Sequence, residues 1–132
     1  MGSLFIPVIE GTTRPGRQSI HVAKLLAEVG NSLEDVETVL VDPADMNIPS
    51  EGKNEENRDP RFSEITARAD AFFFVIPEYN HAFPGTLKSL IDSELENYIH
   101  KPVALAGVSA GPWGGVRAVE SMVPVVRELG LA

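Results

Sequence analysis

The sequence predicts an α/β fold in which helices cover both faces of a parallel β-sheet, an arrangement called doubly wound. Two observations favour this class: short apolar runs alternate with stretches of helical periodicity, and polar loops follow three of the apolar runs. A chain of 132 residues is enough for one domain that buries about two-thirds of its unfolded surface. We therefore expect a single α/β domain over residues 1–132.

Four apolar runs are the expected strands. They cover residues 4–9, 36–41, 71–76 and 103–108. The third run is aromatic and β-branched, which favours a buried strand over a helix, and Pro77 ends it because proline cannot donate to a ladder. The fourth run is apolar on both faces, which is typical of an interior strand.

Helical periodicity follows the first strand and precedes the third. The first helix is expected to begin at Ser19 as its N-cap, and Gly30 is expected to end it. Its apolar positions are Val22, Leu26 and Val29. Residues 50–61 are almost wholly polar, which predicts a mobile loop, and a short helix is expected over residues 61–68.

Two further helices are expected in the second half of the chain. One starts near Pro84, because proline suits the first turn of a helix. Its apolar stripe comprises Leu87, Leu90, Ile91, Leu95 and Tyr98. The other covers residues 115–129, and Pro124 inside it predicts a kink or a break.

Only Leu131 and Ala132 follow the last expected helix, where a doubly wound domain continues with a fifth strand and helix. We therefore expect these two elements to be missing and the chain to be short at its C-terminus. The fourth strand would then lie at an edge of the sheet, where an apolar strand favours pairing with another chain.

Composition and charge exclude several classes of function. The net charge of -8 argues against binding of nucleic acid or of anionic membranes, since both need a basic face. The absence of cysteine excludes disulfides, thiolate metal sites and cysteine nucleophiles. No stretch has the length of a membrane span, and the first residues lack the basic start of a signal peptide. We expect a cytoplasmic protein.

The loop after the first strand, residues 11–19, has the composition of a phosphate cradle. It combines hydroxyls, Arg14 and Arg17 with the N–H groups of a helix N-terminus. It lacks the Gly-Lys-Ser/Thr ending of a P-loop and is not a Gly-x-Gly-x-x-Gly fingerprint. The alternative is a polar turn with two solvated arginines.

The loops after the third and fourth strands suit a flat ligand. Residues 77–85 carry large aromatic and amide side chains; alternatively these pack in the core or at turns, and His81 lies at the surface. Residues 109–118 carry glycines that let backbone N–H groups approach a ligand closely, although they could form a flexible connector. Trp113 is expected to be a packing or interface residue. All three loops follow the carboxyl ends of strands, where ligands of open α/β sheets bind.

Together these loops resemble the NADPH-dependent FMN reductase family, which has a flavodoxin-like fold and includes quinone, azo-dye and chromate reductases. The family motifs are Gly-Ser/Thr-x-Arg-x-x-Arg, Pro-Glu-Tyr-Asn-His-x-x-Pro-Gly-x-Leu-Lys-x-x-Ile-Asp and Ser-x-Gly-x-x-Gly-Gly-x-Arg-Ala. This sequence carries them at residues 11–17, 77–92 and 109–118, and the resemblance covers residues 4–129. It departs from the family at Ala110 and Pro112, where tyrosine and glycine are common.

The resemblance implies a flavodoxin-like sheet of strand order 2-1-3-4, with the fifth strand absent, and a set of FMN-binding residues. The phosphate would be held by Thr12, Arg14, Arg17, Gln18 and Ser19. The ribityl chain and the ring edge would be lined by Pro77, Glu78, Tyr79 and Asn80. The pyrimidine side of the ring would meet Ser109, Gly111, Gly114 and Gly115. Hydride transfer between nicotinamide and flavin needs no protein nucleophile or metal, so we name no catalytic residue and no metal ligand.

The implied function is that of an FMN-dependent oxidoreductase that uses NADPH or NADH and passes electrons to a quinone, azo, metal-oxyanion or flavin acceptor. The alternatives are a flavodoxin-type electron carrier without nicotinamide activity, and a non-enzymatic truncated fragment. Family members commonly form homodimers or homotetramers through helices beside the flavin. Leu95, Tyr98 and Trp113 are the residues we expect at such a contact.

Overall fold

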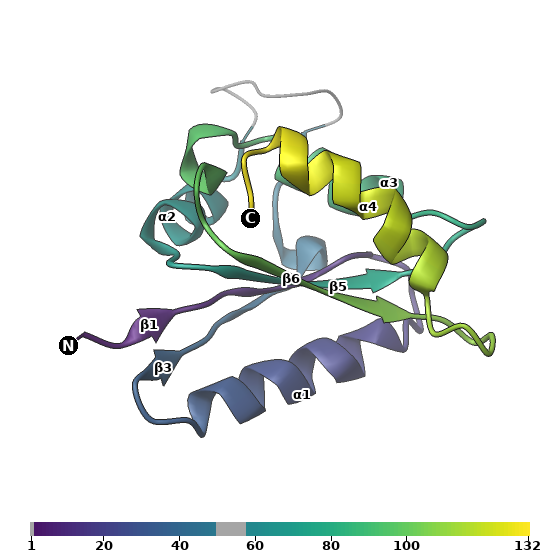
Figure 1. The fold of residues 1–132 in the computed structure, drawn as a ribbon, viewed down its shortest axis with the longest axis horizontal. Helices are drawn as coiled ribbons and strands as arrows, with labels where there is room; N and C mark the ends of the chain where they lie inside the picture. The colour runs from purple at the N-terminus through teal and green to yellow at the C-terminus, as the bar shows by residue number, and fades with distance from the viewer. Residues whose placement is uncertain (1, 50–57) are drawn as a thin grey trace.

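The computed structural model describes residues 2–49 and 58–132. A parallel sheet lies between helix α1 on one face and helices α2, α3 and α4 on the other (Figure 1). The predicted α/β class is therefore confirmed. Of the predicted polar loop over residues 50–61, residues 50–57 lie outside the described part of the chain.

The strands at one edge of the sheet are short, and those toward the other edge are longer. They are β1 (Leu4–Phe5), β2 (Val8–Glu10), β3 (Val36–Glu37), β4 (Leu40–Val41), β5 (Phe72–Pro77) and β6 (Val103–Val108). β1 pairs with β3, and the other four form a parallel sheet of order β4-β2-β5-β6. This is the expected order 2-1-3-4, with the first two predicted strands each divided in two. Pro7, between β1 and β2, has no N–H, so the ladder loses a bond there.

Helix α1 (Ser19–Asn31) departs from the prediction at both ends. Its N-cap is Gln18, and Ser19 is the first helical residue, whose hydroxyl donates to Glu10 instead of capping the helix. Gly30 does not end the helix. It lies inside the last turn against Thr38, where a Cβ would come within 2.5 Å of the Thr38 Cγ2 atom, so its role is close packing. The buried side of α1 is made by Ser19, Ala23 and Ala27, while Val29 is exposed.

Helix α3 (Gly85–Ile91) ends earlier than its apolar pattern predicts. The Ser93 hydroxyl donates to the Leu90 carbonyl at 2.6 Å, and the Tyr98 hydroxyl donates to the Ile91 carbonyl at 3.0 Å. These bonds satisfy carbonyls that a continuing helix would have used, so the chain turns. Tyr98 then lies in a 3₁₀ turn, η2 (Glu96–Tyr98).

The remaining helices are α2 (Pro60–Arg68), the 3₁₀ turn η1 (Pro43–Asp45) and α4 (Val116–Glu128). α4 continues through Pro124, so the predicted break is absent. Pro124 and Glu120, four residues earlier, are both exposed, and solvent can therefore satisfy the carbonyl that the proline leaves without its helical donor.

The larger core lies between the sheet and helices α2, α3 and α4. Phe72, Phe74 and Ile76 of β5 point into it. The Phe72 ring meets the Tyr98 ring edge-on, with 5.3 Å between the ring centres. Tyr98 has no exposed surface, so the expectation that it contributes to a contact between subunits is wrong. Leu95 and Trp113 are 44% and 67% exposed, which leaves them available for such a contact.

Strand β6 lies at an edge of the sheet, as its last place in the strand order requires. The chain returns to the start of this strand: the Val103 N–H donates to the Ala132 carbonyl at 2.9 Å, and the Ala132 N–H donates to the Lys101 carbonyl at 3.0 Å. Ala104 is exposed, and the rest of β6 is half-buried. Within residues 2–49 and 58–132, no helix is both long and apolar enough to cross a membrane.

Candidate functional site

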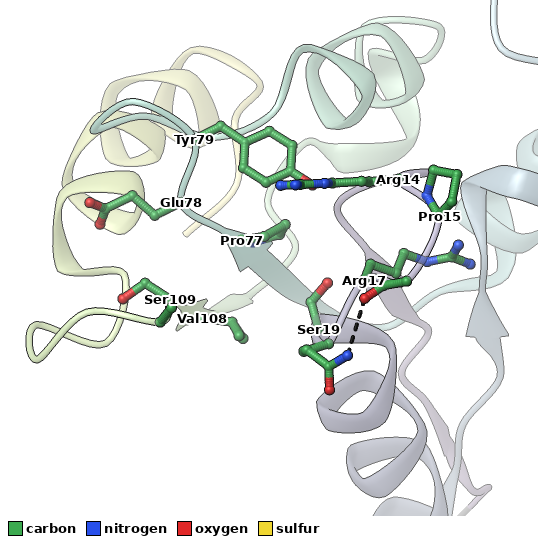
Figure 2. A pocket seen from close by; sticks show the side chains of 12 residues that line it. Arg14, Pro15, Arg17, Ser19, Pro77, Glu78, Tyr79, Val108 and Ser109 are labelled. Carbon is green, nitrogen blue, oxygen red and sulfur yellow. Dashed lines mark hydrogen bonds between the residues drawn. The ribbon is translucent and has the colours of Figure 1, made fainter.

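A cavity of about 540 Å³ lies at the carboxyl ends of β2, β5 and β6 (Figure 2). Its size is within the range of about 300–1,000 Å³ that is usual for small-molecule sites. The lining residues come from all three predicted loops, and they are Arg14, Pro15, Gly16, Arg17, Gln18, Ser19, Pro77, Glu78, Tyr79, Val108, Ser109 and Ala110. The three loops that the sequence singles out therefore meet at one place.

Most of the residues expected to hold a ligand line this cavity. They are Arg14, Arg17, Gln18, Ser19, Pro77, Glu78, Tyr79 and Ser109. The expected residues that do not line it are Thr12, Asn80, Gly111, Gly114 and Gly115. Four further residues line the cavity without being predicted to bind a ligand, and each is adjacent in sequence to one that was: Pro15, Gly16, Val108 and Ala110.

Thr12 supports the first loop from the interior of the protein. It is 2% exposed, and its Oγ1 atom accepts from the Arg14 N–H at 3.2 Å and shares a hydrogen bond of 3.0 Å with the Tyr79 hydroxyl. Gly11, just before it, packs against the end of β5, where a Cβ would lie 2.6 Å from the Val75 carbonyl oxygen. The first loop is therefore held against the second by contacts of both backbone and side chains.

Asn80 shapes the second loop. Asn80 and His81 both have positive φ, 50° and 66°, and form a tight turn between Tyr79 and Ala82. The Tyr79 and Ala82 N–H groups donate to each other's carbonyls at 2.9 and 3.1 Å. Backbone strain of this kind gathers at functional sites. Tyr79, next to this turn, reaches the first loop through its hydroxyl.

Gly115 brings the third loop back onto β6. It has a φ of 83°, and a Cβ there would lie 2.6 Å from the Val108 nitrogen. No larger residue fits this close approach without a shift of the backbone. Within the loop, the Ser109 hydroxyl donates to the Gly111 carbonyl at 3.3 Å, and the Glu78 N–H donates to the Val108 carbonyl at 2.9 Å. The bond between Glu78 and Val108 connects the second loop with the third.

Arg14 is the exposed cation of the site. Its guanidinium carbon lies 5.8 Å from the centre of the Tyr79 ring, and Figure 2 shows the two side chains next to each other at the cavity. A guanidinium over an aromatic ring keeps its N–H groups at its edge, where an anion can accept from them.

Arg17 has different surroundings, which the loop sequence by itself does not predict. It is only 16% exposed, its Nη2 atom pairs with the Asp42 carboxylate, and its Nε atom lies 3.8 Å from Glu10 Oε1. Asp42 directly follows β4, the parallel neighbour of β2. An acidic residue at the end of the adjacent strand is the signal that could have predicted this ion pair.

Glu10 is a buried carboxyl under the first loop. It closes β2, has no exposed surface and accepts from the Ser19 hydroxyl through Oε1. Burial raises the pKa of Glu10 above its ordinary value, against the opposing effects of Ser19 and Arg17. A charged residue that ends an otherwise apolar strand was the visible signal for this group.

The cavity has the chemistry of a site for a flat ligand that bears a phosphate. Arg14 and the N-terminus of α1 supply donors at one end, beside Ser19. Pro77, Tyr79 and Val108 supply apolar surface, and the backbone around Ser109 supplies polar groups beside it. These residues fit FMN in both its charged and its apolar parts.

Comparisons with known proteins agree with this chemistry. The chain is 34% identical over 120 residues to the NADPH azoreductase of Bacillus sp. (strain OY1-2), covering 87% of this chain and 64% of that protein. It is also 34% identical over 121 residues to a quinone reductase of Pseudomonas putida (strain KT2440), covering 86% of this chain and 64% of that protein. The chain thus spans 64% of the length of these relatives.

Solved structures share the fold. The flavoenzyme NAD(P)H:(acceptor) oxidoreductase FerB from Paracoccus denitrificans superposes with a TM-score of 0.77 at 21% identity, over 98% of this chain and 74% of that one. An azoreductase from Bacillus anthracis superposes with a TM-score of 0.67 at 19% identity, over 98% of this chain and 83% of that one. Residues 6–132 match the sequence profile of the NADPH-dependent FMN reductases. The chain therefore belongs to the NADPH-dependent FMN reductase family.

Proposed function

We propose that this protein binds FMN in the cavity of Figure 2 and acts as an NAD(P)H-dependent oxidoreductase with small-molecule electron acceptors. The observation that carries the proposal is the meeting of three loops, from β2, β5 and β6, around one space with donors at one end and apolar surface beside them. Membership of the family supports the choice of FMN and of NADPH or NADH.

The phosphate of FMN would bind at the start of α1. Thr12, Arg14, Arg17, Gln18 and Ser19 would form this part of the site, with Thr12 holding the loop from inside. Gln18 already donates to the Gly16 carbonyl at 3.1 Å, which fixes the last turn before the helix. Such a cluster of donors matters in a chain of net charge -8, since the overall field is unfavourable to an anion.

The ring system would lie against the second and third loops. Pro77, Glu78 and Tyr79 would line its edge, while Asn80 keeps the turn that places them. Ser109 and Gly111 would meet the pyrimidine side, and Gly114 and Gly115 would hold this loop against β6. Bound FMN supplies the capacity to take up a hydride and release electrons, and the protein orients it and excludes water.

The acceptor would be a small oxidant, either a quinone, an azo compound, a metal oxyanion or a free flavin. The names of two relatives, an azoreductase and a quinone reductase, support the first two classes.

Titration with FMN tests the cofactor. The folded protein should quench the fluorescence of FMN at micromolar concentrations, and riboflavin, which lacks the phosphate, should bind more weakly. Glu128→Gln, an exposed substitution on α4 outside the cavity lining, is the matched control and should bind FMN like the parent protein. A folded preparation that takes up no FMN at these concentrations would contradict the proposal.

Stopped-flow reduction tests the activity. NADPH or NADH should bleach the bound flavin rapidly, and a quinone or an azo compound should then restore its colour. Reduction by a protein donor alone, with no reaction toward either nicotinamide, would identify an electron carrier and overturn the reductase part of the proposal.

A further inference from the structure

Glu10 and Ser19 form a buried pair directly behind the proposed phosphate position. Ser19 is 2% exposed and lines the cavity, and its hydroxyl donates to Glu10 Oε1. Glu10 has no exposed surface, the Thr12 N–H also faces its carboxyl group, and among the described residues the Oε2 atom accepts no hydrogen bond. A buried acceptor without a donor lowers the stability of the fold, and such groups are rare in protein cores.

The charged groups that face Glu10 are Arg17 and Asp42. Arg17 Nε lies 3.8 Å from Glu10 Oε1 and has no hydrogen-bond partner among the described residues, while Arg17 Nη2 pairs with Asp42. One guanidinium therefore partly neutralises two carboxylates. With Glu10 ionised, the three side chains together carry a net negative charge next to the place where a phosphate would bind.

The hydroxyl of Ser19 has a single proton, and this limits what it can do. In the structure that proton is given to Glu10. A phosphate dianion offers only acceptors, so Ser19 cannot donate to the phosphate and to an ionised Glu10 at once. A protonated Glu10 removes the conflict, because its O–H donates to Ser19 Oγ and frees the Ser19 proton for the phosphate.

We propose that Glu10 is a positioning residue of the phosphate site, and that binding of a phosphate dianion there is coupled to the uptake of a proton by Glu10 from solvent. The inference rests on the proposed function. No covalent bond of the protein or the ligand changes other than the O–H bond formed at Glu10. Its raised pKa reduces the cost of this protonation.

The coupling sets the sign of the pH dependence. Affinity for FMN should rise as the pH falls toward the pKa of Glu10, by up to about tenfold per pH unit. The affinity should be measured between about pH 6.5 and 8.5. The second pKa of a phosphate ester is about 6, so the ligand stays mostly dianionic in this range. Riboflavin lacks the phosphate and should bind without this dependence.

Calorimetric titration at about pH 7.5, in buffers with different ionisation enthalpies, counts the protons taken up. The parent protein should take up about one proton for each FMN bound and almost none for each riboflavin bound. Glu10→Gln should bind FMN with no uptake from this position and with a flat pH profile, because its amide donates to Ser19 permanently. Glu28→Gln, the same change at an exposed position of α1, should keep the uptake.

The outcomes separate this inference from the proposed function. Binding of FMN to the parent protein with the same proton count as Glu10→Gln would overturn the coupling and leave the proposed function standing. Failure of the folded parent protein to bind FMN would contradict both. If Glu10→Gln does not fold, the parent protein decides alone: equal proton uptake with FMN and with riboflavin would overturn the inference.

Discussion

Arg14 and Arg17 lie three positions apart in the first loop, yet the fold gives them different roles. Arg14 is exposed beside Tyr79, whereas Arg17 is held between Asp42 and Glu10. A ligand phosphate can accept from Arg14 without breaking an ion pair within the protein. To gain a bond from Arg17, the phosphate must compete with two carboxylates. The two arginines, which the sequence alone treats as equivalent, should therefore differ in their contribution to binding.

Substitution of these arginines tests the difference. Arg14→Ala should weaken FMN binding by about tenfold to a hundredfold, since a charge-assisted bond contributes about 1.5–3 kcal/mol. Arg17→Ala should weaken it less, because Arg17 already gives its charge to Asp42. Fluorescence titration measures both, and added salt should weaken the parent complex. A double Arg14→Ala, Arg17→Ala variant that binds FMN like the parent would show that this loop is only a turn.

At the scale of elements, the start of α2 depends on Asp59. This N-cap residue is 3% exposed and accepts from the Arg61 N–H at 2.9 Å and from the Asn47 N–H at 2.8 Å. The Arg61 guanidinium adds an ion pair of 2.7 Å. These donors hold the pKa of Asp59 well below its ordinary value of 3.8, and the Arg61 side chain has the largest effect.

Asp59→Ala should lower the free energy of unfolding by about 1–3 kcal/mol at neutral pH, because the N-cap and the hydrogen bonds from the Asn47 and Arg61 N–H groups to its carboxylate are lost. A lowered pKa in the folded state means that this stability is present above pH 3.8 and is lost as the pH falls below it. Urea denaturation at neutral pH and near pH 3 measures the change. Glu64→Ala, at an exposed position of the same helix, is the control and should stay within about 0.5 kcal/mol. An equal loss for Asp59→Ala at both pH values would contradict the role of the carboxylate.

At the scale of the whole molecule, the two faces of the sheet are covered unequally. Within residues 2–49 and 58–132, helices α2, α3 and α4 lie over one face and α1 lies over the other (Figure 1). Leu25, Val29 and Leu33 on or just after α1 are 48–58% exposed, and Ala104 of the edge strand β6 is exposed as well. Leu25 and Val29 are four residues apart and lie on the same face of α1, and neighbouring exposed apolar side chains favour association. An edge strand adds unpaired backbone groups that another chain can use.

We expect this chain to self-associate in solution. Light scattering coupled to size exclusion should give a mass above the 14.3 kDa of one chain, and the mass should rise with concentration. A double Leu25→Lys, Val29→Lys variant should shift the distribution toward one chain if the α1 face takes part. A thermally stable species of 14.3 kDa at every concentration would contradict the expectation.

The position of the candidate site could be predicted because parallel sheets have a fixed polarity. The carboxyl ends of all strands lie at one edge, so loops after β2, β5 and β6 must meet there, and the motifs identified which loops matter. The end of α3 could not be predicted in the same way. The residues that stop it act through Ser93 and Tyr98 hydroxyls, and Tyr98 is seven residues beyond the carbonyl to which it donates.

What the sequence determined by itself is the order of the main helices and strands, and the family. These follow from local periodicity and from contiguous motifs, which need no knowledge of distant residues. Only the tertiary structure decided which charges of the site are available. Arg17 is engaged because β4 brings Asp42 beside β2, and Glu10 is buried because the first loop and α1 close over the end of its strand. Pairing and burial of charge depend on neighbours that are distant in sequence, and the strength of an electrostatic interaction depends on that burial.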